Sequence, residues 1–96
     1  MQVVIRNYSG HGAKELFDLL DKHKTEVESL IRSVKGFVSY TLARSGEGGF
    51  SVTVCNDKAG IEESVQKAKE WIAKNAGNTG SSTPKVTEGS VIVHTK

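Results

Sequence analysis

The sequence is poor in cysteine and proline and carries little net charge. It has one cysteine, Cys55, one proline, and a formal net charge of only +2 in 96 residues. A lone cysteine excludes an intramolecular disulfide and is typical of a reducing compartment. No apolar stretch approaches the roughly 18 residues of a membrane span, and the N-terminal residues lack the apolar run of a secretory signal. We therefore expect a cytoplasmic protein that does not enter a membrane.

Charge and histidine spacing exclude two further classes of site. The 13 basic residues are interleaved with 11 acidic ones, so no basic tract predicts binding to nucleic acid or to anionic lipid. His11, His23 and His94 do not have the spacing of metal ligands, and no paired cysteine or carboxylate motif accompanies them. We expect neither a metal site nor a nucleic-acid interface.

The apolar pattern predicts six consecutive elements. Residues 2–8 are typical of a strand, and the apolar residues between 13 and 34 recur with the 3.6-residue period of one long helix. Two strands flank the glycine-rich turn near residues 46–49, and a second helix follows Asp57. A polar loop then leads to a last strand at 86–94. The order β-α-β-β-α-β predicts a single ferredoxin-like α+β domain over the whole chain.

The hairpin predicts which side chains share a face of the sheet. A three-residue loop at 46–48 sets Arg44 opposite Phe50 and Tyr40 opposite Val54. One face would then carry the larger apolar residues: Val38, Tyr40, Leu42, Phe50, Val52 and Val54. The other would be small and semi-polar apart from one aromatic ring: Phe37, Ser39, Thr41, Ala43, Ser51, Thr53 and Cys55. Since two helices cover only one face, we expect a second copy on the other, in a homodimer packed sheet to sheet.

The segment from Val34 to Ile72 also carries a family likeness. Its Val-Lys-Gly-Phe, Leu-Ala-Arg-Ser, Gly-Glu-Gly-Gly and Ser-Val-Thr-Val-Cys-Asn-Asp-Lys-Ala-Gly stretches resemble the antibiotic-biosynthesis-monooxygenase-like group of dimeric α+β barrels, in particular small uncharacterised bacterial members. The resemblance implies a homodimer whose two sheets form a barrel with the helices outside, and a ligand pocket between the helices and the sheet of each subunit. The group includes cofactor-independent quinone-forming monooxygenases, haem-degrading enzymes and many proteins of unknown activity.

Four residues are candidates for lining such a pocket. Oxygenation of an aromatic substrate without a cofactor needs an apolar pocket with hydrogen-bond donors near the developing oxyanion. Asn7, Tyr40, Arg44 and Trp71 offer aromatic surface and donors. Each also has a structural interpretation: a strand-end polar group, a core aromatic residue, a charge beside the turn and a packed helix residue, respectively.

The haem-degrading relatives suggest a more specific site, which this sequence does not complete. In those relatives an asparagine on the first strand, a tryptophan on a helix and a haem-ligating histidine on a later helical segment act together. Asn7 and Trp71 match the first two, but no histidine lies between His23 and His94. We therefore expect no haem and no other cofactor.

Two function classes remain open at this point. The first is a homodimer that binds a small aromatic molecule and oxidises it with dioxygen, and the second is a non-catalytic ligand sensor or interaction module of the same fold. An RNA-recognition domain has the same element order, but Val4 and Val52 replace two of its stacking aromatic residues. Whether the protein is an enzyme is not decided by any motif in the sequence.

Overall fold

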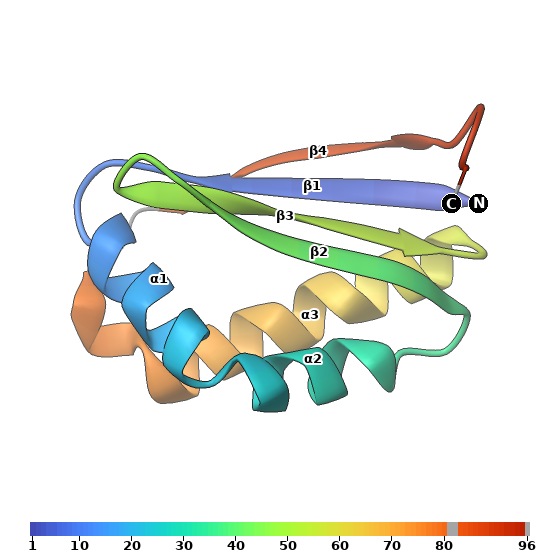
Figure 1. Cartoon of the computed structure of the whole chain (residues 1–96). Helices are drawn as coiled ribbons and strands as arrows, with labels where there is room; N and C mark the ends of the chain where they lie inside the picture. Colours follow the sequence, from blue (N-terminus) through green and yellow to red (C-terminus); the bar gives the residue numbers. More distant parts are fainter. Residues whose placement is uncertain (81–82, 96) are drawn as a thin grey trace.

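The computed structural model describes residues 1–80 and 83–95 and has the predicted ferredoxin-like α+β fold (Figure 1). One antiparallel sheet has the strand order β2-β3-β1-β4. The elements are, in chain order, β1 (Gln2–Tyr8), α1 (Ala13–Lys22), α2 (Lys24–Arg32), β2 (Phe37–Ser45), β3 (Gly48–Cys55), α3 (Lys58–Asn75), the short 3₁₀ helix η1 (Gly77–Thr79) and β4 (Lys85–Ser90).

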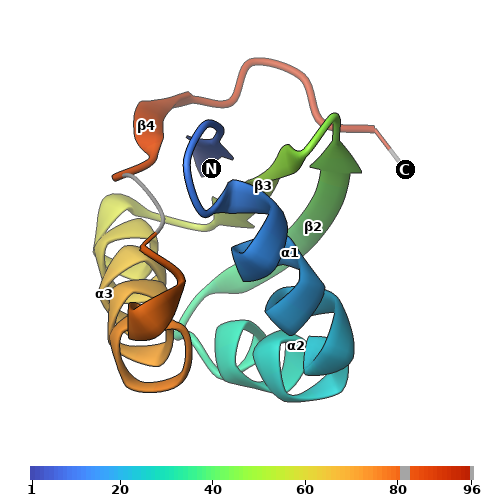
Figure 2. The ribbon, with the colours of Figure 1, turned by 90° about the vertical axis from the view of Figure 1, so that its left-hand side faces the viewer.

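All three α-helices lie on the same face of the sheet (Figures 1 and 2). Leu16, Phe17 and Leu20 of α1 are buried in one core cluster together with Trp71 of α3. A second cluster joins β1, β3 and the first turns of α3. The opposite face of the sheet, called the outer face below, is covered by no helix among the described residues.

The predicted long helix is two helices that meet at His23. The backbone of His23 departs from helical geometry, with φ −108° and ψ 26°. After the buried Leu20, the next buried residue is Val27, seven positions further along the chain, so the stripe that faces the core has a gap at this point. The chain bends there (Figure 1), and the helices on both sides of the bend bury apolar residues.

The predicted three-residue hairpin loop is wrong. Ser45 pairs with Gly48, and Arg44 pairs with Gly49, so only Gly46 and Glu47 form the turn. A Cβ atom on Gly48 would overlap the carbonyl oxygen of Tyr8, and one on Gly49 would overlap the ring of Phe17. Gly48 and Gly49 are therefore strand residues, because other parts of the core approach their backbone closely.

This register changes the composition of both faces of the sheet. Ser51 and Thr53 face the helices, together with Tyr40 and Leu42 of β2, with which they pair. The alternate residues of β3 are on the outer face and are apolar: Phe50, Val52 and Val54. The prediction of a small, semi-polar outer face was wrong, and the outer face is the more apolar side of β3.

The last strand is shorter than predicted. β4 ends at Ser90, and its pairing with β1 runs without a register shift through Gly89. Residues 91–95 then cross the outer face toward β2 (Figure 2), which brings His94 and Thr95 to the edge of that strand. Within the described residues, no helix is long and apolar enough to cross a membrane.

The close packing at Gly49 gives the first prediction. Gly49→Ala forces a methyl group against the carbonyl oxygen of Ala43 and the ring of Phe17 and should lower the free energy of unfolding by about 1–3 kcal/mol. Gly89→Ala, in β4, meets no atom within 4 Å and should change it by less than about 0.5 kcal/mol. Urea denaturation measures the free energy of unfolding of both variants. Equal changes in the two would contradict the assigned register.

Candidate functional site

The helix-facing side of the sheet places polar groups under the helices. Arg6 of β1 lies directly opposite Ser51 of β3, and Ser51 lies opposite Leu42 of β2. Two residues further along β1, on the same face, Tyr8 lies opposite Gly49 of β3. Because side chains alternate along a strand, Arg6 and Tyr8 both point toward the helices.

These residues form the floor of an inner cavity between the sheet and the helices, with a volume of about 20 Å³. Its walls are aliphatic and aromatic, with Trp71 and Ile72 contributed by α3. The lining residues are Arg6, Tyr8, Leu20, Val27, Leu30, Ile31, Tyr40, Leu42, Ser51, Ala68, Trp71 and Ile72. No lining residue carries a carboxylate, an imidazole, an amine or a thiol.

Arg6 is the exceptional residue of this cavity. It is 5% exposed, and its Nη1 atom has no hydrogen-bond partner among the described residues. The Oγ atom of Ser51 is also buried without a partner, and none of the ion pairs found in the described residues includes Arg6. A water molecule fits the volume and can accept a hydrogen bond, but it cannot neutralise the charge.

Two tyrosines lie close to this charge. Burial raises the pKa of Tyr8 and of Tyr40 above the usual 10.0, and the positive charge of Arg6 opposes that rise in both. The phenol groups are therefore protonated at neutral pH and act as neutral hydrogen-bond donors. The inner cavity thus combines one cation with several neutral hydroxyl groups.

An outer groove of about 850 Å³ runs along the free edge of β2. It shares Val27, Tyr40 and Leu42 with the inner cavity, so these three side chains form the partition between the two spaces. The groove is lined by Phe17, Asp21, Lys24, Val27, Glu28, Arg32, Phe37, Val38, Ser39, Tyr40, Thr41, Leu42, Arg44, His94 and Thr95.

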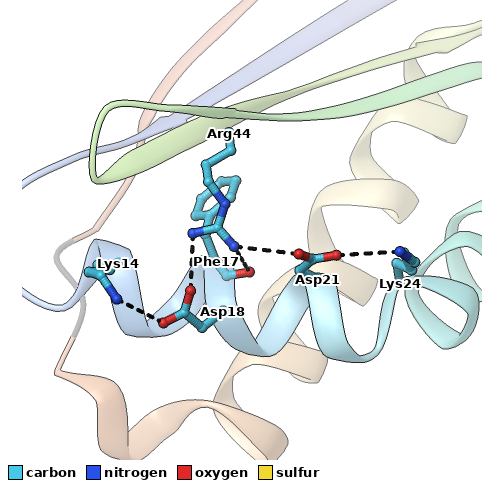
Figure 3. A network of polar contacts seen from close by, with 6 residues as sticks. All are labelled: Lys14, Phe17, Asp18, Asp21, Lys24 and Arg44. Atoms are coloured by element: carbon cyan, nitrogen blue, oxygen red, sulfur yellow. Dashed lines mark hydrogen bonds and ion pairs between the residues drawn. The ribbon is translucent and has the colours of Figure 1, made fainter.

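Arg44 borders the outer groove and connects β2 to α1 (Figure 3). It donates hydrogen bonds to the carbonyl oxygen of Phe17 and to Oδ1 of Asp18, both at 3.1 Å, and its Nη2 lies 3.7 Å from Oδ2 of Asp21. Hydrogen bonds from Lys14 and Arg44 lower the pKa of the Asp18 carboxyl group. Arg44 is paired with two carboxylates, which it shares with Lys14 and Lys24, so it is a structural clamp at the rim.

Trp71 connects the third helix to the second. Its indole Nε1–H donates to Oε2 of Glu26 at 2.8 Å, and the ring of His23 meets it edge to face at a centroid distance of 5.9 Å. The indole ring is buried and lines the inner cavity. Its only donor is thus occupied, and it offers the cavity an aromatic surface.

The four sequence candidates do not form one cluster. Tyr40 and Trp71 line the inner cavity, whereas Arg44 borders the outer groove. Asn7 is exposed and lies opposite Phe50 and Lys85, with its side chain on the outer face. The sequence analysis missed Arg6, Tyr8 and Ser51; the one available signal was that Arg6 and Tyr8 are two residues apart on a strand and share a face.

The cavity does not fit a haem group. Asn7 and Trp71, the residues suggested for haem, lie on opposite sides of the sheet. No histidine lines the inner cavity, and no group of three or more metal-binding side chains was found in the described residues. His23 contacts the Trp71 ring but does not line the cavity, so the cavity itself provides no axial ligand.

No protein-family model and no curated protein matches the sequence. Solved structures do match, over nearly the whole chain. NE2512, a protein of unknown function from Nitrosomonas europaea, has a TM-score of 0.73 at 16% identity and covers 99% of this chain and 91% of that chain. SnoaB, a cofactor-independent oxygenase from Streptomyces nogalater, has a TM-score of 0.64 at 16% identity, with 97% and 94% covered. MhuD, a haem degrader from Mycobacterium tuberculosis solved with two haems in its active site, has a TM-score of 0.64 at 16% identity, with 99% and 98% covered.

The chain shares its ferredoxin-like α+β fold with these solved structures. This agrees with the resemblance found between Val34 and Ile72. The matched proteins include an oxygenase, a haem degrader and a protein of unknown function, so the fold is compatible with binding a small molecule but does not define the activity.

The two buried tyrosines give a prediction for alkaline pH. The unfolded chain ionises its tyrosines near pH 10.0, and the folded chain only at higher pH, so the unfolded state releases protons first. Their contribution to stability is complete below pH 10.0 and is lost as the pH rises above it. The Tyr8→Phe/Tyr40→Phe variant, which removes both tyrosines of the chain, should lose less stability between pH 9 and pH 11 than the wild type. Chemical denaturation at the two pH values measures this, and equal losses would contradict the burial of the phenols.

Proposed function

We propose that the protein is a homodimer that binds a small aromatic molecule between its helices and its sheet. The proposal rests on one observation: the side chains of Val27, Tyr40 and Leu42 form a wall that separates the outer groove from the inner cavity. The aromatic body of the ligand would lie in the groove against Phe17 and Phe37. One polar end would pass the partition and reach the floor of the cavity.

The two volumes support this division. Small-molecule sites commonly measure about 300–1,000 Å³, and the groove, at about 850 Å³, is in that range. The inner cavity, at about 20 Å³, accommodates little more than a water molecule. Tyr40 and Leu42 are only partly buried, so rotation of their side chains would admit a polar group.

Oxygenation without a cofactor is one activity such a site could support. An electron-rich phenol, bound as its phenolate, would react with dioxygen: one oxygen atom becomes a new quinone carbonyl, and the other leaves as hydroxide with the hydrogen of the ring carbon. The cavity would hold the phenolate near Arg6 and exclude bulk water. Because no base lines the cavity, the phenol would have to bind in its ionised form.

The lack of a base in the inner cavity favours the second candidate, a non-catalytic ligand sensor. The only ionisable groups in the lining are Arg6, Tyr8 and Tyr40, and none of them accepts a proton near neutral pH. Binding needs no such group. Ligand binding and oxygen consumption therefore separate the two candidates.

The single tryptophan provides the test. Aromatic ligands should change the fluorescence of Trp71, and Leu42→Phe, which narrows the partition, should weaken binding by about tenfold, the effect of roughly 1.4 kcal/mol. Leu19→Phe, on α1 outside both spaces, is the matched control. Oxygen uptake by the ligand complex would favour the oxygenase, and binding without uptake the sensor. No response to any aromatic ligand would contradict the proposed binding function.

The outer face supports the homodimer. Ile5 and Val52 pair in adjacent strands there, and Ile5 is 36% exposed. Phe50 extends the same apolar surface and is only partly buried. Residues 91–95 cross this face, and the side chains of Ile92 and Val93 are largely exposed to solvent. A second copy packed against this face would bury these side chains.

The predicted dimer can be measured directly. Light scattering at micromolar concentration should give twice the chain mass of 10.4 kDa. Val52→Asp places a charge in the proposed interface and should give the monomer mass, because an unpaired charge is costly to bury. Lys69→Asp, on the exposed side of α3, should stay dimeric. A wild-type protein that is monomeric under these conditions would contradict the interface.

A further inference from the structure

We propose that the ligand carries an anionic oxygen, as a carboxylate or a phenolate, and that this oxygen binds Arg6 and Ser51 on the floor of the inner cavity. The inference rests on the proposed binding function and specifies the chemical class of the ligand. It follows from one buried cation, one buried hydroxyl group and the charges around them.

An unpaired cation in a protein interior is unfavourable. A buried charge loses its hydration and is normally retained only with a partner of opposite sign. Arg6 is 5% exposed, its Nη1 has no partner, and it belongs to no ion pair found among the described residues. A methionine or leucine would fill this position at lower cost. The positive charge of Arg6 therefore suits a negatively charged partner, and the described residues provide none.

The groups around Arg6 restrict what that partner can be. Ser51, directly across the strand pair, has an unpartnered Oγ, and the phenols of Tyr8 and Tyr40 stay protonated. Arg6, Ser51 and the two tyrosines can each donate a hydrogen bond, and no side chain of the lining is negative. This arrangement suits an oxygen anion and repels a cation. The planar guanidinium group also matches the geometry of a carboxylate.

The charges of the outer groove do not compete for this role. Arg44 is paired with Asp18 and Asp21, and Lys24 lies 3.5 Å from Asp21. Arg32 lies 2.8 Å from Oε2 of Glu28. Each cation of the rim thus has an acidic partner within the chain. Arg6 differs from all three in being buried and unmatched.

An isosteric pair of probes tests the charge preference. Isothermal calorimetry with 2-naphthoate and the neutral 2-naphthamide should show at least about tenfold tighter binding of the anion to the wild-type protein, as expected for a charge-assisted hydrogen bond. Arg6→Met should remove the preference by weakening naphthoate binding and leave naphthamide within about twofold. Arg6→Lys, which keeps the charge, should retain part of the preference.

The possible outcomes separate this inference from the proposed function. Equal binding of both probes to the wild type would overturn the anion site and leave aromatic binding intact. Binding of neither probe would overturn both. Arg44→Met is the matched arginine control: a preference lost in Arg44→Met but kept in Arg6→Met would place the anion in the outer groove and contradict the inference.

Stability without ligand provides a second readout. Removing an unpaired buried charge should raise the midpoint of thermal unfolding in Arg6→Met by several degrees. Removing the paired charge in Arg44→Met, which holds β2 to α1, should lower it. A lower midpoint or failure to fold in Arg6→Met would show that Arg6 is paired within the chain, and the inference would be wrong.

Discussion

The close contact of Tyr8 and Phe17 with the backbone of Gly48 and Gly49 sets the arrangement of the rest of the molecule. It leaves no room for a Cβ atom on either glycine, so both become strand residues and the turn is limited to two residues. The register that results directs Ser51 toward the helices. Without this contact, alternate residues of β3 would exchange faces.

The two faces of the sheet acquire different roles from this register. The helix-facing side of β3 carries small polar residues, which leave space above Arg6 instead of filling it with valine or phenylalanine. The outer side carries the large apolar residues that a second copy could cover. A charge kept unpaired in the cavity reduces stability, a common property of binding sites that are formed in advance of their ligand. The proposed binding site and the proposed dimer interface therefore depend on the same pair of glycines.

The sequence predicted the element order because the 3.6-residue and two-residue periods are clear over long segments. It did not predict the register, since glycines in a hairpin have the same local signature whether they form the turn or lie under a packed side chain. It also favoured Asn7 over Arg6 as a site residue. Both sides of β1 are partly apolar, so alternation does not reveal which polar residue points inward. Which residue points inward is set by the pairing of Arg6 with Ser51, and these two residues are far apart in the sequence.

A crystal structure of the protein with bound 2-naphthoate is the most direct test of the central claim, that the unpaired charge of Arg6 selects the ligand. The account predicts the naphthalene ring in the groove along β2, with Tyr40 and Leu42 displaced. One carboxylate oxygen should lie within hydrogen-bond distance of both Nη1 of Arg6 and Oγ of Ser51. A naphthoate bound elsewhere, or an Arg6 side chain paired with a carboxylate of its own chain, would contradict the account.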